Sequence, residues 1–181
     1  MTAQDQNPST KGTPGAVITA YAFKYSGTFY AFADQKFPEL KGYPPDNGRG
    51  TLLQAAIIVS TLIHMERATR GAGRDALHAG VEQAFAPSVQ RRHHAAIQDL
   101  ACALIERRRG ELKDDAIPSF ETIAGAPDQK LMNAIGLWLV LSASKKPQLD
   151  PADEKLAAAI GRSAWTSGKM ISRMLLPKQQ P

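Results

Sequence analysis

Arginine is the residue type in this chain best suited to hold an anion, and it clusters in the middle of the sequence. Residues 42–112 contain nine of the eleven arginines and none of the eleven lysines. A guanidinium contacts a carboxylate or phosphate through two parallel hydrogen bonds, whereas a lysine offers a point charge. Two groups of arginines in this region form a candidate partner- or anion-binding surface: Arg67, Arg70, Arg74, Arg91 and Arg92.

The same arginines also have two simpler interpretations. A chain with twenty-eight alanines is typical of a GC-rich, bacterial-like coding sequence, which favours arginine codons. Arg91 and Arg92 lie near the start of an expected helix, where the helix dipole opposes positive charge. They therefore require either a bound anion or acidic partners, for which Glu66, Asp75 and Glu82 are available.

The second candidate surface is aromatic, because residues 20–37 hold seven of the chain's twelve aromatic side chains. As a helix, this segment would carry rings on opposite faces and would require complete burial. As a hairpin that turns at Ser26 and Gly27, it would pair rings across two strands on one face. We therefore predict a β-hairpin over about residues 19–34, with an interface or stacking face formed by Tyr21, Phe23, Tyr30 and Phe32.

Three roles for this hairpin follow from its pattern. Its ring face can pack on the core as a lid without further function. Its edge contains no proline and one lysine, so it is open to strand pairing with a second copy of the chain. Finally, its rings can stack on bases or sugars, although no local cluster of lysine and arginine accompanies them.

Motifs for catalysis, cofactors and metals are missing from the sequence. It contains no GxGxxG, GxxxxGK or GxSxG pattern. No two of the four histidines have the spacing that places two metal ligands on one helix face. Cys102 is the single cysteine, and its surroundings are apolar. The sequence thus predicts no cofactor, no metal and no catalytic residues, and it favours a protein that is not an enzyme.

Periodic apolar residues predict helices over residues 51–69, 72–86, 88–109, 128–144 and 150–176, with one or two further turns at 118–125. The last helix has the strongest start signal, Asp150 as cap followed by Pro151. It also carries small residues at helical spacing, which indicate close contact with a neighbouring helix: Ala157, Gly161, Ala164 and Gly168. The expected fold is mainly α, a single-domain bundle of five to six helices with the hairpin packed on it.

Residues 16–176 are expected to form one domain, with a flexible lead-in at 1–15 and a flexible tail at 177–181. The lead-in lacks the apolar region of a secretory signal, and the longest uncharged runs are too short to cross a bilayer. With the single cysteine, these features favour the cytoplasm. The net charge of +5 is spread thinly along the chain.

The leading hypothesis is a non-catalytic, cytoplasmic helical bundle that binds a protein partner or a second copy of itself. The first alternative is nucleic-acid binding, suggested by the basic pI, the arginines and the rings. The second alternative is a small-molecule binder or enzyme with a pocket between the bundle and the hairpin.

Overall fold

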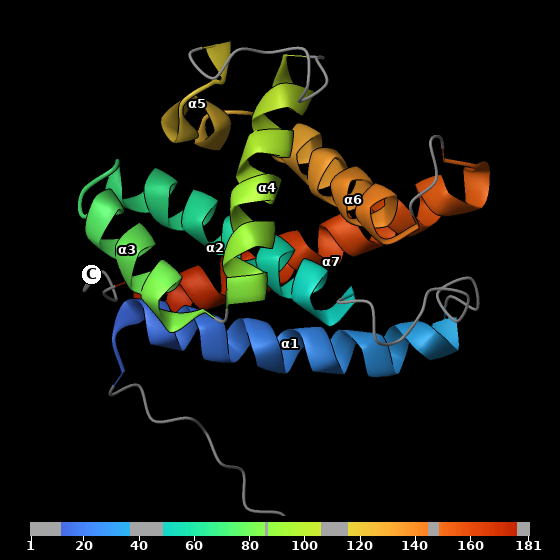
Figure 1. Cartoon of the computed structure of the whole chain (residues 1–181), viewed down its shortest axis with the longest axis horizontal. Helices are drawn as coiled ribbons and strands as arrows, with labels where there is room; N and C mark the ends of the chain where they lie inside the picture. The colour runs from blue at the N-terminus through green and yellow to red at the C-terminus, as the bar shows by residue number, and fades with distance from the viewer. Residues whose placement is uncertain (1–11, 37–48, 86, 106–115, 145–148, 177–181) are drawn as a thin grey trace, which may run out of the picture.

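A computed structural model of the chain describes residues 12–36, 49–85, 87–105, 116–144 and 149–176. Within these ranges the chain forms seven helices and no strand (Figure 1). The helices are α1 (Pro14–Lys36), α2 (Arg49–Thr69), α3 (Arg74–Ala84), α4 (Pro87–Leu104), α5 (Phe120–Ala124), α6 (Asp128–Ser144) and α7 (Pro151–Leu175). Helices predominate as predicted, but the described residues form seven of them in place of five or six, and the predicted β-hairpin is wrong.

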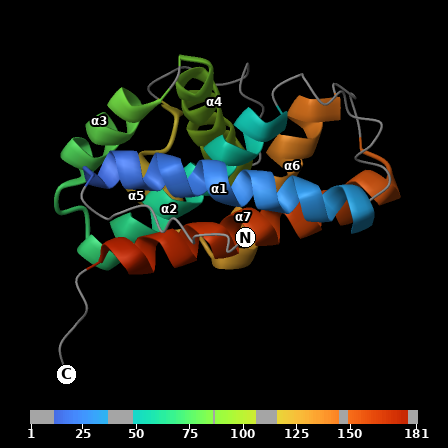
Figure 2. The same cartoon turned by 90° about the horizontal axis from the view of Figure 1, so that it is seen from below.

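Helix α2 is the central element of the fold. Every residue from Ala55 to Ile63 is buried, so the helix is covered on all sides. This stretch includes Ser60 and Thr61, whose hydroxyls each donate a 2.8 Å hydrogen bond to a carbonyl one turn earlier. Their polar groups are thereby satisfied inside the helix. Helices α1, α4 and α7 pack around α2, and α1 lies across α2 and α7 (Figure 2).

Helix α7 approaches its neighbours closely at glycines. A Cβ atom placed on Gly161 would lie 2.1 Å from the carbonyl oxygen of Met132 in α6, and one on Gly168 would lie 2.5 Å from the Cβ of Ser60 in α2. Gly136 of α6 faces Gly161 across the same contact. The predicted close packing of the small residues is confirmed, and the neighbouring helices belong to the same chain.

Helix α1 occupies the segment for which the hairpin was predicted. Pro14 is its first residue, where proline is favoured because the missing N–H has no helical partner. Its buried residues form one stripe at helical spacing: Gly15, Val17, Ile18, Tyr21, Ala22 and Ser26. The hydroxyl of Ser26 donates to the carbonyl of Phe23 at 2.9 Å. The supposed turn at Ser26 and Gly27 is therefore a continuous part of the helix.

The rings of α1 do not form one shared face. Tyr21 is buried and stacks on Tyr25 with ring centroids 6.1 Å apart, whereas Phe23 is 70% exposed. Tyr30 and Phe32 belong to the same helix, but their side chains lie outside the described residues. The expectation that a helix here needs every ring buried is wrong, because a helix tolerates an exposed phenylalanine such as Phe23.

The remaining helices start and end close to their predicted limits. Asp150 caps α7 by accepting hydrogen bonds from the N–H groups of Ala152 and Asp153, both at 2.9 Å. Helix α4 ends at Leu104, and the rest of its predicted range, 106–109, lies outside the described residues. So do residues 1–11 of the predicted lead-in and the tail 177–181. None of the helices described is both long and apolar enough to span a membrane.

Candidate functional site

The connection between α2 and α3 is a tight reversal built from left-handed residues. Arg70, Gly71 and Gly73 have φ angles of 53°, 81° and 74°. Three N–H groups of the connection, those of Gly71, Ala72 and Arg74, donate to carbonyls of residues 66–71. Because these donors are used within the segment, the sequence RGAGR does not present them to a phosphate.

An ion pair closes this reversal. Nε of Arg74 donates to Oε2 of Glu66 at 2.8 Å, and its NH2 group contacts Oε1 of the same carboxylate. Glu66 is 7% exposed, so this is a largely buried carboxylate held by a two-point contact. Those hydrogen bonds raise the pKa of Arg74 above its ordinary value. The pair fixes the start of α3 against the end of α2.

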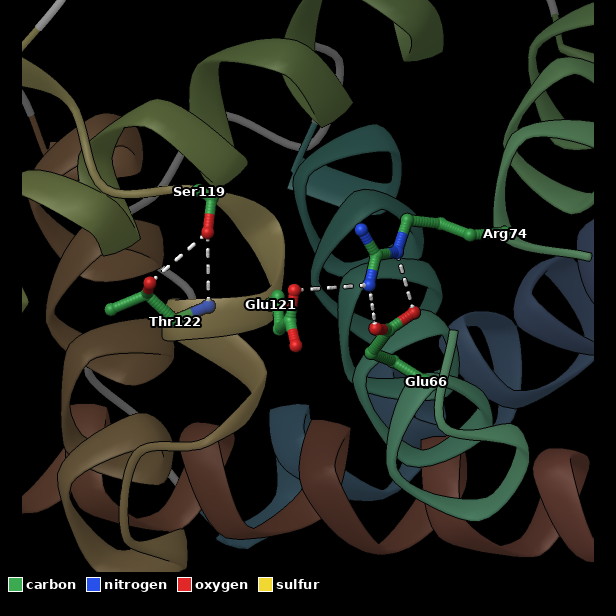
Figure 3. Close-up of polar contacts among 5 residues, drawn as sticks. All are labelled: Glu66, Arg74, Ser119, Glu121 and Thr122. Atoms are coloured by element: carbon green, nitrogen blue, oxygen red, sulfur yellow. Dashed lines mark hydrogen bonds and ion pairs between the residues drawn. The ribbon is translucent and has the colours of Figure 1, made fainter. Parts of the chain in front are cut away.

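Helix α5 brings a second carboxylate to the same guanidinium. Figure 3 shows Arg74 between Glu66 of α2 and Glu121 of α5, whose Oε2 lies 3.7 Å from the NH2 group of Arg74. Ser119 caps α5 by accepting a hydrogen bond from the N–H of Thr122 at 3.3 Å. Glu121 itself is 76% exposed, so it remains open to solvent.

A cavity of about 440 Å³ lies beside the ion pair, where the start of α1, the C-terminal half of α2, α3 and the end of α7 meet. Most of its wall is apolar and comes from Leu62, Met65, Ala72, Ala76, Leu77 and Leu175. The charged or polar side chains in the wall include Glu66, Arg74, His78 and Gln83. A mainly apolar wall with a few polar groups is the usual composition of a small-molecule site.

His78 supplies an uncharged polar group to this cavity. Its ring packs edge-on against Phe120, with ring centroids 4.7 Å apart. Burial lowers the pKa of His78 below its ordinary value, although the nearby carboxylates of Glu66 and Glu82 oppose the shift. The imidazole is therefore neutral at neutral pH and can both donate and accept a hydrogen bond.

A second, more open hollow of about 340 Å³ adjoins the first. Its wall is mainly charged and comes from Arg70, Arg74, Asp75 and Glu121, together with small residues of the reversal. Gly73, Arg74 and Ala76 line both hollows. The reversal and the Arg74 side chain thus form a common wall between an apolar space and a polar one.

The structure brings two of the five predicted arginines, Arg70 and Arg74, to this site. Arg67 points elsewhere, donating to the carbonyls of Ala124 and Ala126 at 2.6 Å and to Asp128 at 2.5 Å. These bonds hold the connection between α5 and α6. The other two arginines, Arg91 and Arg92, lie on α4, where neither forms an ion pair with a described residue.

Two histidines outside the cavity, the half-buried His64 and the buried His93, each have one buried ring nitrogen without a hydrogen-bond partner among the described residues. These nitrogens are Nε2 of His64 and Nδ1 of His93. Burial is the main cause that lowers the pKa of His64 to about 4, with the cation of Arg67 adding to it. No three His, Cys, Asp or Glu side chains in the described ranges are grouped so that they could hold a metal ion.

No sequence motif indicates the cavity or marks Glu121 as a site residue. Glu66, an available acidic partner for the arginines of α4, pairs with Arg74 instead. A site lined by parts of four helices has no continuous motif, so its chemistry follows from the assembled geometry. Comparison of the chain with protein-family models, with curated proteins and with solved structures found no match in any of the three.

Proposed function

We propose that this protein binds a small, mostly apolar molecule in the cavity between α1, α2, α3 and α7, and that it acts in the cytoplasm without catalysis. The observation that carries this proposal is the mainly apolar, partly open cavity of about 440 Å³ with charged or polar groups including Glu66, Arg74 and His78 in its wall. Pockets of roughly 300 to 1,000 Å³ hold drug-sized ligands.

This proposal is the second alternative from the sequence, without the hairpin as its wall. The leading hypothesis, a protein partner or self-association, relied on the hairpin edge and on the arginines. The hairpin does not exist, and the guanidiniums of Arg67 and Arg74 are engaged within the chain. Binding of a protein or of nucleic acid through Arg91 and Arg92 stays a prediction that no observation here favours.

A role in binding without catalysis is supported by the state of the ionisable groups in the cavity. Both oxygens of Glu66 are held by Arg74, so this carboxylate is not free to take up a proton from a ligand. His78 packs against Phe120 rather than against a nucleophile. The arrangement supports hydrogen bonding to a ligand more than general acid or base chemistry.

A blocking substitution tests the proposal. Ala76→Phe places a large ring at a position that lines both hollows, so we expect decanol, used as a neutral apolar probe, to bind at least tenfold more weakly. The measurement is isothermal titration calorimetry below the solubility limit of decanol, supported by the rise in unfolding temperature that a ligand causes.

Ala79→Phe is the matched control, because Ala79 is also exposed on α3 and does not line the cavity. Both substitutions exchange the same residue types in one helix, so their cost in helix propensity is equal. Equal binding by the two variants would contradict the proposed location. Failure of the unmodified protein to bind decanol would contradict the proposed function.

A further inference from the structure

We infer that the ligand is an amphiphile with a positively charged head group, its apolar body in the cavity and its head in the adjoining charged hollow. This inference rests on the proposed function and names the class of ligand. The cavity and the charged hollow share one wall, which is formed by Gly73, Arg74 and Ala76. A molecule that passes this wall meets apolar side chains on one side and charged ones on the other.

The difference between the two linings indicates an amphiphile rather than a uniformly apolar ligand. The cavity is walled mainly by aliphatic side chains from three helices, including Leu62, Leu77 and Leu175. The hollow has four charged residues among the seven that line it. Transfer of an apolar group from water is favourable only into the cavity. A charged or polar group keeps its hydration and gains charge contacts only in the hollow.

The charges around the shared wall determine the sign of the head group. Two arginines and three carboxylates line the cavity and the hollow. The arginines are Arg70 and Arg74, and the carboxylates are those of Glu66, Asp75 and Glu121. Glu66 takes up the charge of Arg74 through a two-point contact. The balance in the open hollow is therefore one cation, Arg70, against the carboxylates of Asp75 and Glu121.

The geometry of Glu121 makes it the main partner for a cation. Its Oε2 lies 3.7 Å from Arg74, which is longer than a hydrogen bond, and its side chain is 76% exposed. Asp75 is exposed in the first turn of α3. A cationic head meets both carboxylates without displacing the buried ion pair, and only Arg70 opposes it. An anionic head meets two like charges and gains Arg70 alone, because the guanidinium of Arg74 is already occupied.

Three probes with one ten-carbon chain test this inference: decylammonium, decanol and decanoate. We expect decylammonium to bind about two- to tenfold more tightly than decanol at low ionic strength, and decanoate to bind more weakly than decanol. Exposed charges contribute roughly 0.2 to 1 kcal/mol each, which corresponds to up to about fivefold in affinity per carboxylate. Added salt should reduce the differences among the three probes, because it screens exposed charges.

Replacing a carboxylate by an amide of nearly the same size removes the charge and keeps the packing. Glu121→Gln should weaken decylammonium binding by about two- to fivefold, with the loss confined to the charged probe. Glu154→Gln is the control, since Glu154 is an exposed carboxylate in the first turn of α7 that lines neither hollow. It should leave all three affinities unchanged.

The outcomes distinguish this inference from the function on which it rests. Binding of decanol with no preference for decylammonium, or tighter binding of decanoate, would overturn the cationic head group and leave the apolar site standing. An equal loss for decylammonium and decanol in Glu121→Gln would overturn the role of this carboxylate in charge recognition. Absence of binding by all three probes would overturn both the inference and the proposed function.

Discussion

Replacing Gly161 by alanine is expected to lower the free energy of unfolding by roughly 2 to 4 kcal/mol. A Cβ on Gly161 would lie 2.1 Å from the carbonyl oxygen of Met132 and 3.2 Å from the backbone nitrogen of Gly136. Both neighbours are backbone atoms of α6, so no side-chain rotation relieves the contact. The two helices must separate, and the core that they bury together loses its packing.

The expected loss of packing is larger than an opposing gain in helix propensity. Alanine favours a helix over glycine by about 1 kcal/mol, so the substitution would stabilise the chain if α7 were free at this position. The change in the free energy of unfolding caused by Gly161→Ala is therefore the sum of the packing loss and the propensity gain. Urea denaturation, read as the change in midpoint at constant slope, gives the difference directly.

Gly27→Ala is the matched control, because a Cβ on Gly27 meets nothing within 4 Å. Only the helix propensity changes at this position, so the free energy of unfolding should rise by about 0.5 to 1 kcal/mol. The same variant tests the correction to α1, since a tight hairpin turn at this position would lose its glycine and become less stable. A Gly161→Ala variant as stable as the unmodified chain would contradict the contact between α6 and α7.

Acidification is expected to destabilise the protein through His93. This side chain is 1% exposed, and its ring lies among Phe85, His78 and His94 at centroid distances of 5.9, 6.4 and 5.8 Å. Burial, followed by the neighbouring histidines, lowers the pKa of His93 from 6.5 to about 3. The folded chain therefore keeps this imidazole neutral at pH values where the unfolded chain protonates it.

The sign of the pH dependence follows from this difference. The contribution of neutral His93 is fully present above about pH 6.5 and is lost as the pH falls through the folded pKa near 3. Its full size is on the order of 3 to 5 kcal/mol. The pKa of His64, lowered to about 4, acts in the same direction over the upper part of this range.

Substitution of His93 isolates its share of the acid sensitivity. His93→Leu removes the titrating group at nearly the same volume, and Nδ1 of His93 has no hydrogen-bond partner to lose among the described residues. We expect this variant to lie within about 1.5 kcal/mol of the unmodified chain at pH 7.5 and to lose less stability on acidification to pH 4. Urea denaturation at a series of pH values provides the measurement.

His94→Gln is the control for the acid series. The His94 side chain is 59% exposed, and its Nε2 lies 3.1 Å from Oε1 of Glu82, so it forms a surface contact. Its removal should change the slope of stability against pH less than His93→Leu does, because burial is the main cause that lowers the pKa of His93 and His94 is only one of the neighbours that add to it. If His93→Leu had the same slope as the unmodified chain, burial of His93 would not be the cause of the acid sensitivity.

Helices α2 to α7 could be predicted because their signals are local. The apolar run of α2, the Asp150 cap of α7 and the small residues near Gly161 each act within a few turns of one helix. Helix α1 was missed for a physical reason. Over residues 20–33 its rings fit pairing across a hairpin, and the residues that decide for a helix, Pro14 to Ile18, lie before that window.

The candidate site could be predicted only in part. Arg70 and Arg74 were identified as anion-binding candidates, but the reversal that brings Glu66 to Arg74 depends on three left-handed residues. Glu121 lies on α5, nearly fifty residues after Arg74 in the chain. The cavity is unfilled space where parts of four helices meet, so no residue pattern along one helix encodes it.

Binding of an apolar molecule in this cavity can be observed residue by residue with methyl NMR spectroscopy, using decanol as the ligand. We expect shifts concentrated on the methyl groups of the cavity wall, those of Leu62, Met65, Leu77 and Leu175, and their loss in Ala76→Phe. Shifts confined to exposed apolar side chains away from the cavity, those of Leu137, Leu141, Met170 and Met174, would contradict binding in this cavity.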